Sequence, residues 1–255
     1  MGAVNRRADS EFAAVKALCS TGLSDYGVAR ETGVPRSTVR GWRHLAERER
    51  SWIPANPDWR PPHPERYAYL LGVYLGDGHI VVAGQSAFIR ISLDSVYPAI
   101  VDEVAASLEL TFSPAAARRY QRATDRSEIL QLSSAALPIA FPQHGPGQKH
   151  LRTIELATWQ RLIAERHPRA LLRGLIHSDG ARCINRFDTH LPSGRVAHYE
   201  YPRYFFSNLS ADIRRIFCDS CEPLGIRWTQ SNPRNISVSH RDSVACLDAF
   251  VGPKS

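Results

Sequence analysis

Lysine and long apolar runs are the features this chain most lacks. Only three of its 255 residues are lysine, Lys16, Lys149 and Lys254, so arginine carries nearly all of the positive charge. No apolar stretch reaches the roughly 18 residues that a membrane-spanning helix needs, and the N-terminus lacks the apolar core of a signal peptide. We therefore expect a soluble, cytoplasmic protein that associates with the nucleoid if its partner is DNA.

The number of cysteines does not suit a secreted protein stabilised by disulfides. There are five cysteines, an odd number, which argues against such a framework. Cys218 and Cys221 have the spacing of zinc ligands, and a zinc site would need Cys183 and Cys246 to converge on them. The pair falls on a predicted helix beside Phe217, which favours packing in a core. The signatures of a nucleophile elbow, a P-loop and a dinucleotide-binding fold are absent.

The excess of arginine indicates a polyanionic partner. The net charge is +7 and the pI is about 9.4, which makes nucleic acid the first choice. Arginine side chains match phosphates and the edge of guanine. A GC-rich genome would produce the same excess without any functional meaning. Double-stranded DNA is the predicted partner, and no membrane contact is expected.

Two short apolar segments organise the rest of the chain. Residues 67–78 read YAYLLGVYLGDG, and residues 171–180 read LLRGLIHSDG. Each predicts a mostly buried helix that ends at a left-handed glycine, Gly78 or Gly180. Small residues four apart lie on one helix face and let two helices approach closely. These helix-interface positions are Gly72, Gly76, Gly174 and Ser178.

Packing along that face would bring Asp77 and Asp179 side by side. Two carboxylates in a dry interface repel each other. A bound divalent cation would relieve the repulsion, and a hard ion such as Mg²⁺ prefers oxygen ligands of this kind. The alternative is two core helices that happen to end in Asp-Gly.

Both segments resemble the motif of the LAGLIDADG homing endonucleases, with residues 70–78 and 172–180 as the two copies. The two acids are 102 residues apart (179 − 77), and a similar series of elements follows each copy. We expect strands at 80–82, 88–93, 111–120 and 128–132 with helices at 95–108 and 137–141, then strands at 183–190, 196–207, 227–230 and 236–240 with helices at 210–221 and 243–250. The predicted fold class is α+β, with tandem pseudo-symmetric αββαββα repeats over 65–150 and 151–255.

The resemblance implies a monomer with internal two-fold pseudo-symmetry that cleaves double-stranded DNA with Mg²⁺ or another divalent cation. Asp77 and Asp179 would hold the metal, together with the carbonyls of Gly76 and Ser178. Lys149 and Lys254 match the family lysines that lie near the activated water. An alternative is a catalytically silent helix-turn-helix/LAGLIDADG transcriptional regulator, like a group of bacterial sporulation regulators. That group usually lacks the acids, so their presence here favours an endonuclease.

The predicted strands offer arginines to DNA, because every second side chain of a strand faces the same side. The candidates are Arg90, Arg182, Arg186, Arg195 and Arg203, of which some are expected to be merely solvated. His177 departs from the usual motif, and it would face solvent, touch a phosphate or pack between the helices.

Residues 1–50 predict a small all-α domain of three short helices. The order of its small and apolar positions resembles a helix-turn-helix of the resolvase type, whose last helix enters the major groove. A helical protein-binding domain is the alternative. Residues 51–64 hold five prolines and predict a linker, which Trp52 and Trp59 would dock on a neighbouring domain. The predicted DNA contacts are Arg36, Ser37, Thr38, Arg40 and Arg43.

Overall fold

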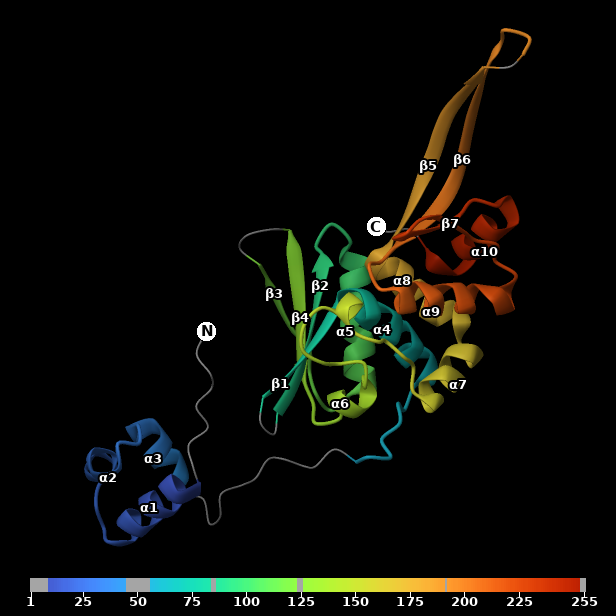
Figure 1. Cartoon of the computed structure of the whole chain (residues 1–255). Coiled ribbons are helices and arrows are strands. Elements are labelled where there is room, and N and C mark those ends of the chain that lie inside the picture. Colours follow the sequence, from blue (N-terminus) through green and yellow to red (C-terminus); the bar gives the residue numbers. More distant parts are fainter. Residues whose placement is uncertain (1–8, 45–55, 84–85, 123–125, 191, 253–255) are drawn as a thin grey trace. The chain divides into compact units, whose positions relative to one another are not determined.

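The computed structural model describes residues 9–44, 56–83, 86–122, 126–190 and 192–252. They form two compact units, one comprising residues 9–44 and the other the described residues from 56 onward (Figure 1). Trp52 and Lys254 lie outside the described residues. Trp59 packs within the second unit, where its ring stacks on Phe112 at 5.6 Å between centroids.

The first unit is a bundle of three short helices, α1 (Asp9–Ser20), α2 (Asp25–Thr32) and α3 (Arg36–Arg43). Ser24 begins α2 by accepting a hydrogen bond from the Gly27 N–H. Gly33 ends it in the left-handed region at φ 68°, which a residue with a side chain rarely adopts. The core holds four valines that lie fully out of solvent: Val15, Val28, Val34 and Val39. The predicted all-α N-terminal region is confirmed.

The second unit contains two copies of one arrangement. The first copy comprises α4 (Pro64–Asp77), β1 (Gly78–Ala83), β2 (Ser86–Asp94), α5 (Pro98–Thr111), β3 (Arg118–Gln121), β4 (Ser127–Ser133) and α6 (Leu137–Ala140). A 3₁₀ turn, η1 (Lys149–Leu151), and α7 (Thr158–Arg166) follow. The second copy comprises α8 (Pro168–Asp179), β5 (Gly180–His190), β6 (Val196–Ser207), α9 (Ala211–Cys221), the 3₁₀ turn η2 (Glu222–Leu224), β7 (Thr229–Asn232), β8 (Asn235–Val238) and α10 (Arg241–Val251).

Both copies have the same sheet topology, which confirms the predicted tandem αββαββα fold class. The strand orders are β1-β2-β4-β3 and β5-β6-β8-β7, and all pairs are antiparallel. Each sheet turns one face to the helices and the other to solvent. On β2 the buried side chains are Ile89, Ile91 and Leu93, while Arg90 between them is exposed. This alternation is the period-two pattern that a half-buried strand requires.

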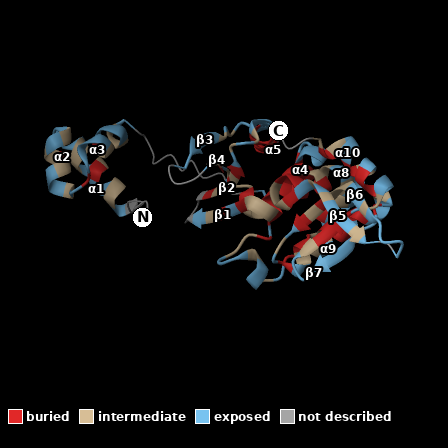
Figure 2. Ribbon diagram, turned by 90° about the horizontal axis from the view of Figure 1, so that it is seen from above, coloured by how far each residue is buried: buried red, intermediate tan, exposed pale blue. Residues whose placement is uncertain are grey.

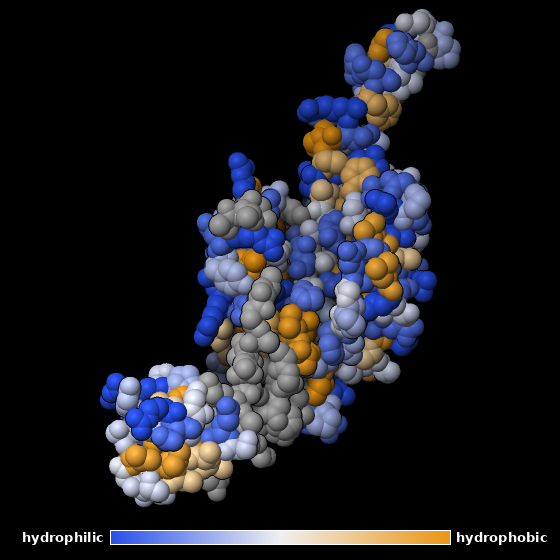
Figure 3. Space-filling view, turned by 60° about the vertical axis from the view of Figure 1, so that its left-hand side comes forward, coloured by the Kyte–Doolittle hydropathy of each residue, from blue (hydrophilic) through white to orange (hydrophobic). Residues whose placement is uncertain are grey.

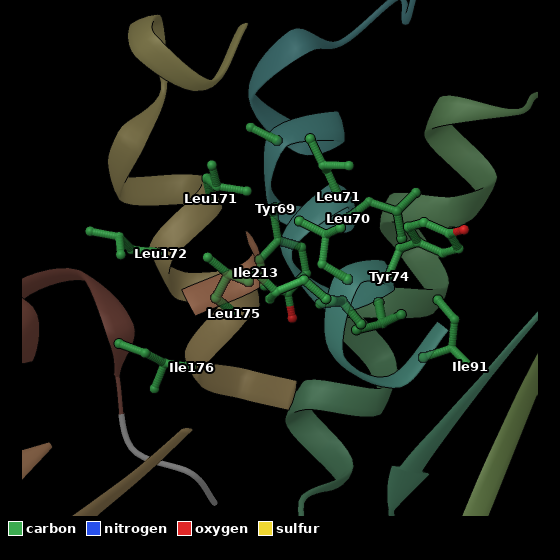
Figure 4. Packing of buried hydrophobic residues seen from close by; sticks show 14 of the residues in the cluster. Tyr69, Leu70, Leu71, Tyr74, Ile91, Leu171, Leu172, Leu175, Ile176 and Ile213 are labelled. Carbon is green, nitrogen blue, oxygen red and sulfur yellow. The ribbon is translucent and has the colours of Figure 1, made fainter. Parts of the chain in front are cut away.

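Helices α4 and α8 lie against each other at the centre of the unit and are its most buried helices (Figure 2). Every residue from Tyr67 to Leu75 is buried. Leucines of both helices meet between them, including Leu70 and Leu71 of α4 and Leu171 and Leu175 of α8 (Figure 4). The core of the second unit is therefore built around the two motif helices.

Three expectations about local structure were wrong. Gly78 and Gly180 are not left-handed, since both are extended and begin strands β1 and β5. Glycine is needed there because a Cβ on Gly78 would lie 2.7 Å from Tyr74 Cα. The strand predicted from residue 111 begins only at Arg118, because α5 continues to Thr111. Helix α7 was not predicted.

The second sheet has a much longer first hairpin than the first sheet. Strands β5 and β6 have 11 and 12 residues, against 6 and 9 in β1 and β2. Their outer part projects beyond the helices that cover the sheet (Figures 1 and 3). The two halves therefore share a topology but present different surfaces.

Candidate functional site

The two motif helices touch through their backbones. A Cβ on Gly72 would lie 2.4 Å from the Leu171 carbonyl oxygen, and one on Gly174 would lie 2.0 Å from the Tyr69 carbonyl oxygen. Near the C-terminal ends, a Cβ on Gly76 would lie 2.3 Å from Ser178 Oγ. No side chain fits at these distances, so the small residues permit the contact. The structure therefore places all four predicted interface residues at the crossing of α4 and α8.

This contact brings the two acids to one place. A Cβ on Gly76, the residue before Asp77, would lie 2.9 Å from Asp179 Oδ2. Asp179 Oδ2 also accepts a hydrogen bond from Asn208 Nδ2 at 2.6 Å. Both acids are half-buried and end their helices. Because a helix C-terminus carries partial negative charge, the two ends together favour a cation.

Lys149 supplies a cation at this position. Its Nζ donates hydrogen bonds to the carbonyls of Tyr74, Leu75 and Gly76, with the last two at 3.0 Å. The ammonium also lies 4.9 Å from the centroid of the Tyr74 ring. Burial lowers the pKa of Lys149 to about 8, although Asp179 and Asp77 both act to raise it. The lysine therefore joins α4, η1 and both acids in one charged cluster.

Two further residues of this cluster were not predicted. Asn208 follows β6 and holds Asp179, and its only sequence signal is its position directly after a predicted strand. His79 is exposed on β1, two residues after Asp77, and its pKa is lowered by partial burial and then by Lys149, Arg152 and Arg90.

His177 packs between helices, which was one of its three predicted positions. It is buried, and its Nε2 donates to the Val251 carbonyl at 2.9 Å because a carbonyl only accepts. Its Nδ1 lies 2.9 Å from the Tyr69 hydroxyl of α4. Arg173 Nε donates to the same Val251 carbonyl at 3.1 Å. These bonds fix the end of α10 against α8, and Lys254 lies outside the described residues.

The solvent face of the first sheet carries a row of polar side chains. The register aligns His79 with Arg90, Arg90 with Gln131 and Gln131 with Arg118. Arg90 Nε donates to Gln131 Oε1 at 2.9 Å, and its guanidinium lies 4.9 Å from the Phe88 ring centroid. Arg90 is thus on the predicted face and is held in place from two sides.

In the second sheet the predicted arginines divide between the two faces. Arg203 lies on the solvent face, where it donates to Ser237 Oγ at 2.5 Å and packs 4.1 Å from the Phe205 ring centroid. Arg182 lies on the helix face, so its predicted orientation toward DNA is wrong. Its guanidinium binds both oxygens of Asp248 on α10, at 2.7 and 3.0 Å, because it shares the face of buried Tyr204.

The two remaining predicted arginines, Arg186 and Arg195, belong to the outer part of the β5–β6 hairpin. Arg186 shares the face of Arg182 and is paired with the exposed carboxylate of Glu200 across the strands at 3.0 and 3.3 Å, and its contact with DNA stays a prediction. Arg195 is exposed just before β6 begins. The opposite face of this hairpin is aromatic, with Phe187 stacked on Tyr199 at 5.1 Å.

Most of the predicted contact residues of the first unit are exposed on α3. Arg36, Ser37 and Arg40 are exposed, and Thr38 is half-buried. Arg43 differs, because its Nε binds Asp25 at 2.6 Å and its Nη2 donates to the Leu23 carbonyl at 2.7 Å. Arg43 joins α3 to the beginning of α2, so its side chain stabilises the packing of the three-helix bundle.

The described part of the chain contains no preformed cluster of metal-binding side chains. No group of three or more His, Cys, Asp or Glu side chains is placed there to hold a metal ion. Cys218 and Cys221 are buried on α9, and burial raises the pKa of the Cys218 thiol to about 11. They pack as core residues. No helix among the described residues is long and apolar enough to span a bilayer.

Comparisons with known proteins find only distant structural similarity. No family model matches the sequence, and no curated protein matches it. A LAGLIDADG meganuclease, I-AabMI bound to uncleaved DNA, is 11% identical with a TM-score of 0.43 over 72% of this chain and 82% of that one. The LAGLIDADG homing endonuclease I-SmaMI bound to cleaved DNA is 10% identical with a TM-score of 0.45 over 73% and 83%. Full-length DUF199/WhiA from Thermatoga maritima is 12% identical with a TM-score of 0.47 over 77% and 58%. The similarity concerns the fold alone.

Proposed function

We propose that this chain binds double-stranded DNA and hydrolyses its phosphodiesters with a divalent metal, as a LAGLIDADG-type endonuclease. The observation that carries the proposal is the meeting of Asp77, Asp179 and Lys149 at the C-terminal ends of two helices in backbone contact. Such a contact leaves no room for larger side chains at the crossing and keeps the two helix ends, where the acids lie, close together.

The residues at this position fit a hard divalent cation. Two carboxylates and the carbonyls of the last helical turns supply oxygen ligands, which Mg²⁺ prefers. The hydrogen bond from the Lys149 ammonium to the Gly76 carbonyl supports this fit, because it already places positive charge beside that oxygen. Asp77 and Asp179 would hold the metal with the carbonyls of Gly76 and Ser178. The bound metal would lower the pKa of a water and stabilise charge on the phosphate.

The chain's own groups serve proton transfer and orientation. Burial holds the pKa of Lys149 down to about 8, so the neutral amine becomes available at mildly alkaline pH, where it is suited to accept a proton from the attacking water. Asn208 holds the carboxylate of Asp179 in one orientation through its hydrogen bond to Oδ2. Lys254 is the counterpart of Lys149 in the second repeat and is proposed to act on the other strand.

DNA would lie along the solvent faces of the two sheets. Arg90 and Arg203 face outward there, and Arg195 stands near the end of the long hairpin. The first unit would make a second contact through Arg36, Ser37, Thr38 and Arg40 of α3, with its N-terminus entering the major groove. A tether between two DNA-binding units makes the second contact intramolecular and so raises affinity.

A second candidate function is DNA-binding regulation without cleavage. The bonds of Lys149 to three α4 carbonyls favour it, because the ammonium already neutralises the helix end and lies near both acids. A protein that satisfies its carboxylates with an internal cation needs no metal to fold or to bind DNA.

Cleavage of a selected binding site separates the two functions. A duplex library is enriched on the full chain without metal, and the enriched site is cloned into a plasmid. An endonuclease would linearise that plasmid with Mg²⁺, whereas Asp77→Asn combined with Asp179→Asn would bind it and leave it intact. A wild-type protein that binds the site and never cuts it, with Mg²⁺ or Mn²⁺, is a regulator.

A further inference from the structure

Each sheet carries one arginine that is stacked on a phenylalanine of the same strand. In β2 the guanidinium of Arg90 packs on Phe88, and in β6 that of Arg203 packs on Phe205. Both pairs occupy neighbouring positions on one face, since their members are two residues apart. A polar side chain of the adjacent strand also holds each arginine: Gln131 of β4 in one case and Ser237 of β8 in the other.

The two pairs have the opposite order along their strands. Gly78 and Gly180 begin β1 and β5, and they are aligned with Ile91 and Phe206. Counting outward from these aligned residues, Arg90 is one position away and Phe88 is three. In the second sheet Phe205 is one position away and Arg203 is three. Arginine and phenylalanine have therefore exchanged places between otherwise matching strands.

The exchange moves the guanidinium outward in the second sheet. Two residues of a strand span about 6.6 Å at about 3.3 Å per residue. Because B-DNA rises about 3.4 Å per base pair, this displacement corresponds to about two base pairs. The neighbouring strands also indicate that Arg90 and Phe205 occupy equivalent positions in the two sheets. Arg90 is aligned with Gln131 of β4, and Phe205 is aligned with Ser237 of β8.

Both arginines are prepared to recognise a base. An arginine has five N–H donors, of which Arg90 uses one within the sheet. Arg203 uses one on each Nη, on Ser237 and on Asn185 Oδ1 at 3.5 Å, and its Nε is buried, which leaves one N–H on each Nη for a base. A guanidinium fixed by an aromatic ring and a hydrogen bond loses little rotamer freedom on binding. Its most frequent specific partner in the major groove is guanine, through O6 and N7.

We propose that the chain recognises a site whose two halves are offset, in which the guanine read by Arg203 lies about two base pairs farther from the centre than the guanine read by Arg90. This inference rests on the proposed DNA-binding function and adds which bases are read and where. The site is then not a palindrome, although the fold that reads it is pseudo-symmetric.

The test exchanges the residues of each pair and needs no knowledge of the centre. Enriched sites are determined for the full-length wild type, for Arg203→Phe with Phe205→Arg, and for Phe88→Arg with Arg90→Phe. The first exchange should bring the two guanines about two base pairs closer, and the second should separate them by about two more. All other enriched positions should stay in place.

Single substitutions assign each guanine to its arginine. Arg90→Lys and Arg203→Lys should each lower discrimination at one guanine by roughly 5- to 150-fold and leave the other unchanged. Matched controls are Arg119→Lys and Arg182→Lys, because these arginines pair with Asp102 and Asp248 away from the proposed DNA face. The controls should change neither position, and melting curves verify that all variants fold.

Three results would count against the inference. If the two guanines kept their spacing in the sites enriched by both exchange variants, the inference would be overturned, but the proposed DNA binding would still stand. A uniform loss of affinity in the lysine variants would assign these arginines to phosphates and overturn it as well. Failure of the wild type to enrich any sequence would overturn the proposed function and the inference together.

Discussion

Replacing Gly174 by alanine tests the helix contact that positions both acids. The added Cβ would lie 2.0 Å from the Tyr69 carbonyl oxygen and 3.0 Å from Val73 N. An ordinary carbon–oxygen contact needs about 3.3 Å, so α4 and α8 must separate locally by roughly 1.3 Å. Both neighbours are backbone atoms of a buried helix and have no rotamer by which to move aside.

The expected cost is large for one methyl group. Overpacking of a core costs about 1–3 kcal/mol and occasionally more, and here it exceeds the gain of about 1 kcal/mol in helix propensity from glycine to alanine. A net loss of about 2 kcal/mol would lower the Tm of a unit of this size by roughly 4–8 °C. Differential scanning calorimetry of the full chain measures the change in the second unit.

Gly41 provides the matched control. It also lies within a helix, α3, but nothing lies within 4 Å of the position of its Cβ. Gly41→Ala should therefore stabilise the first unit by about 0.8 kcal/mol through propensity alone. If Gly174→Ala melted within 2 °C of wild type, the helices would not cross at this residue, and the proximity of Asp77 and Asp179 would lose its basis.

Three other expectations follow from the structure. Lys149 has a folded-state pKa of about 8 against about 10.5 in the unfolded chain, so between these pH values the unfolded chain binds more protons and the free energy of unfolding rises with pH. In urea unfolding experiments from pH 7.5 to 10.5, the wild type should gain up to about 3 kcal/mol of stability relative to Lys149→Met. A stability difference that does not change with pH would mean that the ammonium is exposed. Deleting residues 1–53 should shorten the DNase footprint at one end only. It should also reduce the slope of log affinity for DNA against log salt concentration by about 2, because the contacts of Arg36 and Arg40 are lost. An unchanged footprint and slope would mean that the first unit binds something other than DNA. Arg43→Ala should lower the melting temperature of the first unit and Arg40→Ala should not, because only Arg43 is bonded to Asp25 and Leu23; equal melting temperatures would show these bonds to be dispensable.

The sequence was informative for most features that depend on local spacing, although the left-handed conformation expected at Gly78 and Gly180 was wrong. The glycines of the two motifs, the alternation in β2 and the Ser24 cap each follow from rules that act within a few residues. The orientation of Arg182 was not predictable in this way. A shift of one residue in register moves a side chain to the other face, and the acid that binds it, Asp248, is 66 residues away in the sequence.

The same limit applies to the candidate site. The resemblance of the motifs pointed to Asp77, Asp179 and Lys149, but the bonds of Lys149 to the end of α4 depend on how a loop 73–75 residues later returns to that helix. Asn208 and His79 carry no pattern of their own. Only the fold shows that one binds Asp179 and that the other lies among Lys149, Arg152 and Arg90.

The central claim is that Asp77 and Asp179 act as one metal site, and a double-mutant cycle on metal binding tests it most directly. Mn²⁺ binding by electron paramagnetic resonance is measured for wild type, Asp77→Asn, Asp179→Asn and the double variant. Because carboxylates of one site act together, each single change should remove most of the binding, and the double change should add little. Additive losses, or a full-strength site that survives either single change, would contradict a shared site.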